Sequence, residues 1–226
     1  MNNWSAAFAW LTDTSNWVGA QGIPTRVGQH LVITATAMAL ASLFALPVGI
    51  AIGHTRRGAV LIAGLAGAAR AVPTLGLLTL FGLGLGIGLK APLLALVVLA
   101  IPSLMAGAYA GIQAVDPTVV DAARAIGLRE GHIVWRVEIP LAAPVIIGGI
   151  RAATLQVVAT ATLAAYIADQ GLGRYLFAGL KTRDYAQMVG GALIVILLAL
   201  VMEVVLATVQ RLVATKVTHP HLANSG

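Results

Sequence analysis

Long apolar runs alternate with short polar segments along this chain of 226 residues. Two runs, His30–Ile52 and Ala91–Ile112, contain no Asp, Glu, Lys or Arg, and two others, Leu141–Ala165 and Met188–Val213, carry only one or two such residues each. A helix of roughly 20 apolar residues crosses a hydrocarbon core of about 30 Å. The pattern therefore predicts four membrane-spanning helices at these positions.

The segment 58–89 is also apolar but is harder to interpret. Its 32 residues would form a helix of about 48 Å, which is too long for one straight crossing. Arg70 and Pro73 lie inside it. We expect one crossing here, with the part before Pro73 forming a surface helix or a broken helix, and about five transmembrane helices in total. Two crossings within this segment are the alternative.

Basic residues predict the orientation of the chain. With five crossings, seven Lys and Arg residues share one side of the membrane and five lie on the other. The pair Arg56 and Arg57 falls in a short loop, and basic residues in short loops mark the cytoplasmic side. We therefore expect an external or interfacial N-terminal segment (1–28), a transmembrane domain (29–213) and a cytoplasmic tail (214–226).

Composition agrees with an all-α integral membrane protein. Hydrophobic residues make up 59% of the chain and charged residues 10%, with a mean hydropathy of +0.92, whereas soluble domains carry about 25% charged residues. The net charge of +6 is explained by basic residues kept on the cytoplasmic side rather than by a nucleic-acid partner. The chain has no cysteine, which excludes disulfides, thiolate metal sites and a cysteine nucleophile.

The segment 116–140 is polar, although long apolar runs flank it on both sides. Asp116 followed by Pro117 predicts a helix start, because the carboxylate can cap free N–H groups and proline needs none in the first turn. Gly127 is expected to end this helix, since glycine takes the left-handed conformation cheaply. A second short helix is expected over 130–137, ended by Pro140.

The first of these helices is expected to be amphipathic. Arg124 follows Asp121 at i+3, the spacing of an ion pair on one helix face. Ala122 and Ala123 would let a groove of a partner protein close around the backbone. Four apolar residues are expected to form one stripe: Val119, Val120, Ala123 and Ile126.

Three interpretations fit such a segment. It could lie on the lipid headgroups as an amphipathic loop, or dock a cytoplasmic partner protein. It could also be a DNA-binding helix-turn-helix, because "AARAIGL" has the spacing of that turn. A recognition helix must reach the major groove, which two flanking membrane spans would prevent. We favour the docking interpretation.

The segment resembles the "EAA" loop of binding-protein-dependent ABC importer permeases. That pattern is Glu-Ala-Ala, three residues, Gly, nine residues, Ile, any residue, Leu and Pro. Every spacing is kept here, with Asp for Glu, Val for Ile and Ile for Leu as mild departures. The matching residues are Asp121, Ala122, Ala123, Gly127, Val137, Ile139 and Pro140. We call residues 116–140 the coupling segment.

The resemblance extends over residues 23–213 and is closest to the glycine betaine, carnitine, choline and proline permeases. The stretch "GLGRYLFAGL", which begins at Gly171, is its most telling part outside the coupling segment. The family implies the type I ABC importer permease fold, with a cytoplasmic coupling helix, in the bacterial inner membrane. It also implies osmoprotectants as cargo. A permease for methionine or another amino acid is the alternative, and a stand-alone channel or secondary transporter is a more distant one.

The resemblance also implies the partners. A second permease copy or a sister permease would complete the pore, a cytoplasmic ATPase dimer would bind the coupling helices, and an extracytoplasmic binding protein would deliver cargo. This chain has no Gly-x-x-x-x-Gly-Lys-Ser/Thr phosphate loop. We therefore expect ATP and Mg²⁺ on the partner ATPase, no cofactor in this chain, and no enzymatic activity of its own.

Three charged residues are expected at membrane depth, where ionisable groups are functional candidates. Arg151 and Glu203 each lie ten residues from the cytoplasmic end of a predicted span, about 15 Å deep by helical rise. Their shared depth would allow an ion pair between helices. Arg70 could line the pore or a gate.

Overall fold

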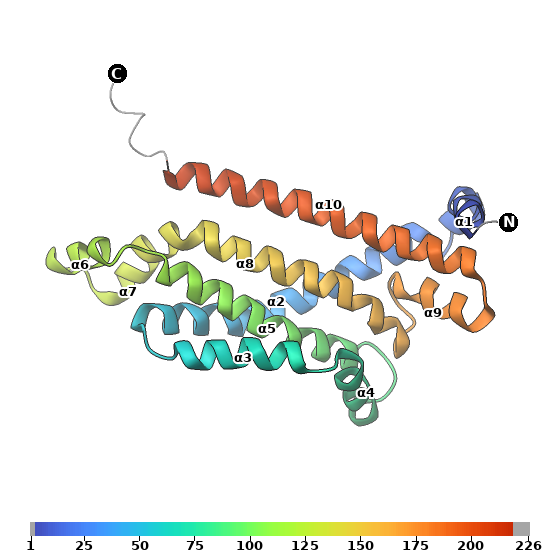
Figure 1. Ribbon diagram of the computed structural model, residues 1–226, viewed down its shortest axis with the longest axis horizontal. Coiled ribbons are helices and arrows are strands. Elements are labelled where there is room, and N and C mark those ends of the chain that lie inside the picture. The colour runs from blue at the N-terminus through green and yellow to red at the C-terminus, as the bar shows by residue number, and fades with distance from the viewer. Residues whose placement is uncertain (1–2, 219–226) are drawn as a thin grey trace, which may run out of the picture. The chain divides into compact units, whose positions relative to one another are not determined.

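The computed structural model describes residues 3–218 of the chain, without the side chains of residues 69–70 and 216–218. The described residues are helical and contain no β-strand, as expected from the sequence (Figure 1). The α-helices are α1 (Asn3–Thr12), α2 (Ile23–Thr55), α3 (Ala59–Ala71), α4 (Thr74–Leu85), α5 (Lys90–Gln113), α6 (Pro117–Ala125), α7 (Glu130–Ile133), α8 (Ile139–Thr160), α9 (Gly173–Thr182) and α10 (Tyr185–Thr218). Short 3-10 or π turns are η1 (Thr14–Trp17), η2 (Val134–Glu138) and η3 (Ala161–Tyr166).

Four helical stretches are long and apolar enough to cross a membrane, which confirms the four predicted spans. They are Ile23–Thr55, Lys90–Gln113, Glu130–Tyr166 and Tyr185–Thr215. The second begins at Lys90 and the third joins α7, η2, α8 and η3 into one rod. The first starts at Ile23, inside the stretch expected to precede the transmembrane domain.

The segment expected to hold the fifth crossing forms two short helices instead of one long helix. Its 13-residue helix α3 and 12-residue helix α4 would reach only about 20 Å and 18 Å. Pro73 is extended, with φ −70° and ψ 111°. Proline also disfavours a helical conformation at the residue before it, and α3 ends at Ala71. The predicted break is therefore present, whereas the number of crossings made by these two helices stays a prediction.

The chain packs as two compact units. Unit 1 comprises Met1–Leu40, Val72–Ala100 and Thr154–Met202, and unit 2 comprises Ala41–Ala71, Ile101–Ala153 and Glu203–Gly226. One boundary follows the end of α3, and the other four fall within α2, α5, α8 and α10, so each of these four helices contributes one part to each unit.

In unit 1, the turn before α9 is held by the start of α2. Gly171 has φ +78°, a conformation that glycine adopts without strain, and its N–H donates to Gln29 Oε1 at 3.0 Å. The next N–H, of Leu172, donates to Nδ1 of the fully buried His30 at 3.4 Å, and His30 Nε2 donates to the Val158 carbonyl at 2.9 Å. These roles require the neutral tautomer with its proton on Nε2.

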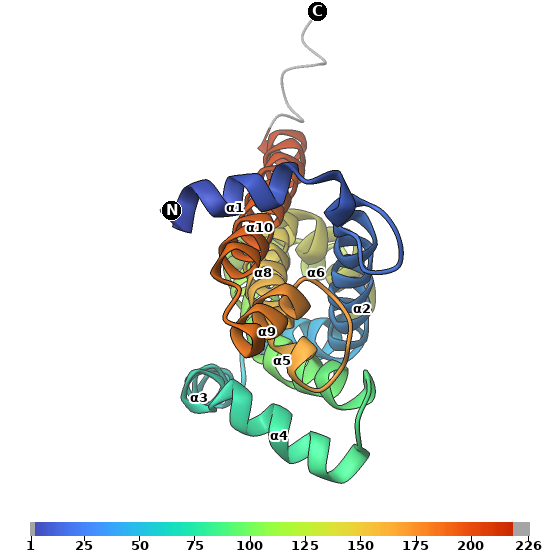
Figure 2. The same ribbon diagram turned by 90° about the vertical axis from the view of Figure 1, so that its right-hand side faces the viewer.

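The N-terminal helix α1 belongs to the same unit and packs on α10, whose start it crosses in Figure 2. The ring of Trp10 fills the space beside Gly190 and meets Tyr175 edge-on, with ring centroids 5.1 Å apart. Tyr175 in turn donates its hydroxyl to the Gln21 carbonyl at 2.7 Å. Aromatic packing therefore fixes α1 to the helical core of unit 1.

In unit 2, glycines let the helices approach closely. A Cβ added to Gly107 of α5 would lie 2.6 Å from the Cα of Gly149 in α8, and one added to Gly53 of α2 would lie 2.7 Å from Ile112 Cβ of α5. Helix association in lipid depends on such close packing. The small residues of the predicted spans thus serve as contact points between helices.

Candidate functional site

The coupling segment lies in unit 2 and begins with a capped helix. Asp116 Oδ1 accepts hydrogen bonds from the Thr118 backbone N–H and the Thr118 hydroxyl, both at 2.8 Å. These bonds lower the pKa of Asp116 below its usual value, the backbone bond contributing most. Pro117 occupies the first turn of α6, where no N–H is needed. The predicted helix start is confirmed in detail.

Helix α6 ends at the predicted glycine. Gly127 has φ +86°, its N–H donates to the Arg124 carbonyl at 2.9 Å, and the Leu128 N–H donates to the Ala123 carbonyl at 3.2 Å. This pair of bonds is the Schellman motif, which satisfies the last helical carbonyls and requires a left-handed residue at this position. Gly127 thereby sets the angle at which the chain enters α7.

One face of α6 is anchored in the core of unit 2. Val120 and Ala123 are buried in a cluster with Ile112, Val115 and Ile133. The predicted stripe is wrong at its other two members, since Val119 is 42% and Ile126 is 80% exposed. A helix of nine residues buries only the face that meets its neighbours, and here two residues at i and i+3 fill that contact.

The second half of the segment differs from the prediction. After α7, the chain continues through the π turn η2, in which the Ile139 N–H donates to the Val134 carbonyl, and enters α8 directly. Pro140 therefore does not end a helix, as we expected, but lies in the first turn of α8. The π turn directly before it carries the chain past this proline, which has no N–H to donate to the preceding helical turn.

The residues of the family pattern separate into an outer and an inner group. Asp121, Ala122, Gly127 and Pro140 are exposed, whereas Val137 and Ile139 are half-buried. Ala123 is buried, so the expectation that a partner groove closes around both alanines is wrong for this residue. Trp135 is 73% exposed, and with Ile126 it adds apolar area to the outer surface of the segment.

A chain of ion pairs crosses the segment. Arg124 pairs with Asp121 at 3.0 Å, as the i+3 spacing predicts, and holds Glu130 through two bonds of 2.9 and 3.2 Å. These contacts raise the pKa of Arg124 above the usual value of an arginine, and the hydrogen bond to Glu130 is the largest cause. His54, in the last turn of α2, lies 3.1 Å from Glu130 and 2.6 Å from Glu138.

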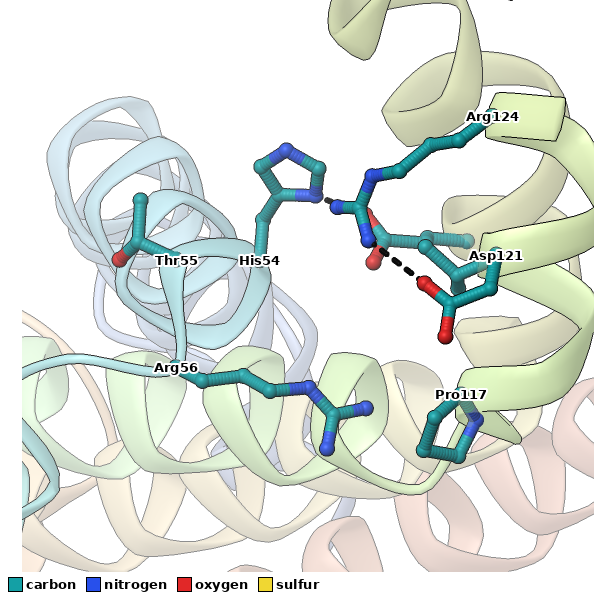
Figure 3. A pocket seen from close by; sticks show the side chains of 8 residues that line it. His54, Thr55, Arg56, Pro117, Asp121 and Arg124 are labelled. Atoms are coloured by element: carbon teal, nitrogen blue, oxygen red, sulfur yellow. Dashed lines mark hydrogen bonds and ion pairs between the residues drawn. The ribbon is translucent and has the colours of Figure 1, made fainter.

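A pocket of about 360 Å³ opens between the end of α2 and the coupling segment (Figure 3). His54 and Arg56 come from α2 and its end, Asp121 and Arg124 come from α6, and Glu138 comes from η2. Nothing in the sequence singles out His54 or Glu138. The only available signal was a carboxylate directly before the apolar helix α8, and its partner is 84 residues away in the chain.

Two of the predicted deep charges meet in unit 2. Arg151 Nε donates to Glu203 Oε2 at 2.8 Å, a second guanidinium nitrogen contacts Glu203 Oε1, and a third donates to Gln210 Oε1 at 3.0 Å. Gln210 Nε2 donates onward to the Pro144 carbonyl at 3.0 Å. The structure thus joins α8 to α10 through a polar network. Arg70 lies near the end of α3, and its side chain is outside the described residues.

The apolar helices define an integral membrane protein, and the coupling segment exposes polar and apolar side chains outside its buried anchor. The chain belongs to the family of binding-protein-dependent transport system inner membrane components, whose profile matches residues 45–219. It is accordingly a multi-pass subunit of the bacterial inner membrane.

Relatives and solved structures agree with this family. The chain is 34% identical over 191 residues to the glycine betaine/carnitine/choline transport system permease protein OpuCB of Bacillus subtilis, covering 84% of this chain and 88% of that one. It is 35% identical to the choline transport system permease protein OpuBB of the same organism, with 81% and 84% covered. An inward-facing structure of the MetNI methionine ABC transporter shares the fold, with a TM-score of 0.74, 18% identity, and 89% and 99% covered.

Proposed function

We propose that this chain is the pore-forming permease subunit of an ATP-driven importer for osmoprotectants such as glycine betaine, carnitine, choline or proline. The observation that carries the proposal is the coupling segment, which keeps the family spacing and presents Asp121, Ala122, Gly127 and Pro140 outward from a buried anchor. The cargo class is supported by the printed substrates of the relatives OpuCB and OpuBB.

The proposed mechanism is alternating access. A partner ATPase dimer binds ATP and Mg²⁺, closes, and displaces α6, which moves as a rigid lever because both its ends are capped and one face is packed. The displacement passes to α5 and α8, which the coupling segment joins, and the pore opens toward a loaded binding protein. Hydrolysis resets the subunits. The pore is completed by a second copy of this chain or by a sister permease.

Transport by reconstituted protein tests this function. The chain is placed in liposomes with its ATPase and binding protein, and uptake of labelled glycine betaine is measured with and without ATP inside. We expect uptake only with ATP and both partners, and competition by unlabelled choline or carnitine. Competition by methionine alone would instead identify an amino-acid permease, and uptake by the chain alone would identify a channel or secondary transporter.

Variants of Gly127 test the coupling role within the same assay. A branched side chain in the left-handed conformation costs roughly 1–2 kcal/mol, so Gly127→Val should tilt or loosen α6 and sharply reduce uptake. Asn adopts this conformation more readily, and Gly127→Asn should retain most of the uptake. Docking through this segment would be contradicted if both variants took up cargo as well as the unchanged chain and the ATPase still co-purified with all three proteins.

A further inference from the structure

His54 of α2 and Glu138 of the coupling segment form a directional hydrogen bond, which apolar packing between the same elements cannot provide. Glu138 is only 4% exposed, and a buried carboxylate is costly unless it is paired and hydrogen-bonded. Its Oε2 accepts from His54 Nδ1 at 2.6 Å. Charge-assisted bonds of this length are strong and directional, whereas the neighbouring cluster around Val120 consists of apolar contacts, which are not directional.

The second nitrogen of the same ring also faces a carboxylate. His54 Nε2 lies 3.1 Å from Glu130 Oε2, and carboxylates only accept hydrogen bonds. The ring of His54 therefore lies between two carboxylates, one from α7 and one from η2, and each presents an acceptor oxygen to a different ring nitrogen.

From His54 the contacts lead to the outer surface of the coupling segment. Glu130 is held by Arg124 through two bonds, and Arg124 also pairs with Asp121, whose side chain is 70% exposed. Asp121 is the carboxylate that matches the family pattern. A continuous series of ion pairs thus connects an exposed residue of α6 with the end of α2.

The π turn contributes to this arrangement. Glu138 is the last residue of η2, and the Ile139 N–H bonds five residues back to Val134. Such turns are rare and frequently occur at functional sites. Here the turn directly precedes α8, so Glu138 connects His54 to the start of that helix as well.

The geometry points to His54 as a positioning residue that transmits the movement of the coupling segment to α2. The apolar cluster holds α6 against the rest of unit 2. The His54–Glu138 bond then sets the direction in which α2 moves when the coupling segment moves. Without this bond the ATPase still docks and hydrolyses ATP, but the movement reaches α2 incompletely. This inference rests on the proposed function as an ATP-driven permease.

Substitutions of His54 separate positioning from folding. The amide nitrogen of Asn reaches the place of Nδ1 and can still donate to Glu138, whereas Leu removes both bonds. We expect His54→Leu to co-purify with the ATPase and hydrolyse ATP, with import per ATP lowered about tenfold, the effect of losing one charge-assisted bond. His54→Asn should restore most of that ratio.

Thr55→Val is the matched control. Thr55 is the exposed residue next to His54 in α2, outside the coupling segment, and among the described residues its hydroxyl bonds only to the Ala51 and Ile52 carbonyls of its own helix. We expect its import per ATP to equal that of the unchanged chain. An unaltered ratio in His54→Leu would overturn the inference, and so would a loss that only follows a lower yield of assembled transporter.

A second measurement does not depend on the cargo. The chain lacks cysteine, so a single Ile126→Cys substitution on the exposed side of α6 can carry a spin label. The label should become more mobile in His54→Leu than in His54→Asn or Thr55→Val. If the label is equally mobile in all of these variants, the positioning role is overturned. If the unchanged chain shows no uptake but the label is more mobile in His54→Leu, only the proposed function is refuted.

Discussion

Arg151 uses all three of its guanidinium nitrogens within one network, two toward Glu203 and one toward Gln210. An arginine inside a membrane-spanning helix is tolerated when it is paired in this way. The pairing leaves no free charge for a cationic cargo to meet, so we interpret the network as a link between α8 and α10 rather than a substrate contact.

A double-mutant cycle tests this interpretation at the residue scale. Glu203→Gln leaves Arg151 with its charge unpaired, and Arg151→Gln leaves Glu203 in the same condition, so each single change should lower the unfolding temperature of the purified protein. The double change removes both charges and should be less harmful than the two single effects added together. Purely additive effects would show that the two side chains do not interact.

At the same scale, Asp116 and Gly127 were predictable because their roles depend on residues next to them in the chain. The Asp116 cap is a bond to Thr118, two residues away. His54 and Glu138 were not predictable, because neither has a local feature that distinguishes it from other polar residues near a span end. Only the packing of α2 beside η2 gives them a function.

Among the elements, α5 and α8 cross with little spare space. A Cβ on Gly107 would lie 2.6 Å from a backbone atom of Gly149, not from a flexible side chain that could turn away. The sequence predicted that small residues would bring helices together. It could not show which glycines face each other, since every span contains several.

Substitution at this crossing tests its role. Overpacking costs roughly 1–3 kcal/mol, and the gain in helix propensity from Gly to Ala, about 1 kcal/mol, offsets only part of it. Gly107→Ala should therefore lower the free energy of unfolding in detergent. Gly64→Ala is the control, because no atom lies within 4 Å of its added Cβ, and it should be neutral or stabilising. The same loss in both variants would argue against a specific close contact.

The errors in the coupling segment also arise between elements. Pro140 was expected to stop a helix because the sequence shows only its own restriction. In the structure it lies in the first turn of α8, because the π turn η2 runs into that helix without a gap and carries the chain past a residue that has no N–H to donate. The predicted apolar stripe on α6 wrongly included Val119 and Ile126, which are exposed. Sequence periodicity identifies apolar positions, but it does not show how much of the helix the neighbouring elements cover.

For the whole molecule, labelling of single introduced cysteines measures the side of the membrane on which each loop lies. The chain has no cysteine of its own that would react. Single cysteines at Val18 (70% exposed) and Ile126 (80% exposed) should react with an impermeant reagent from outside and from inside, respectively. With one crossing in 58–89, Arg57→Cys reacts from inside and Ile87→Cys from outside. Reaction of Arg57→Cys from outside would indicate an even number of crossings there.

By itself the sequence determined the class of this protein, its four long spans and the capped helix α6, because hydrophobic length, proline, glycine and a capping carboxylate act over a few neighbouring residues. Only the tertiary structure decided which charges meet. His30 with the turn at Gly171, His54 with Glu138, and Arg151 with Glu203 each join residues far apart in the chain. A buried polar group must find a partner, but periodicity does not say which residue that partner is.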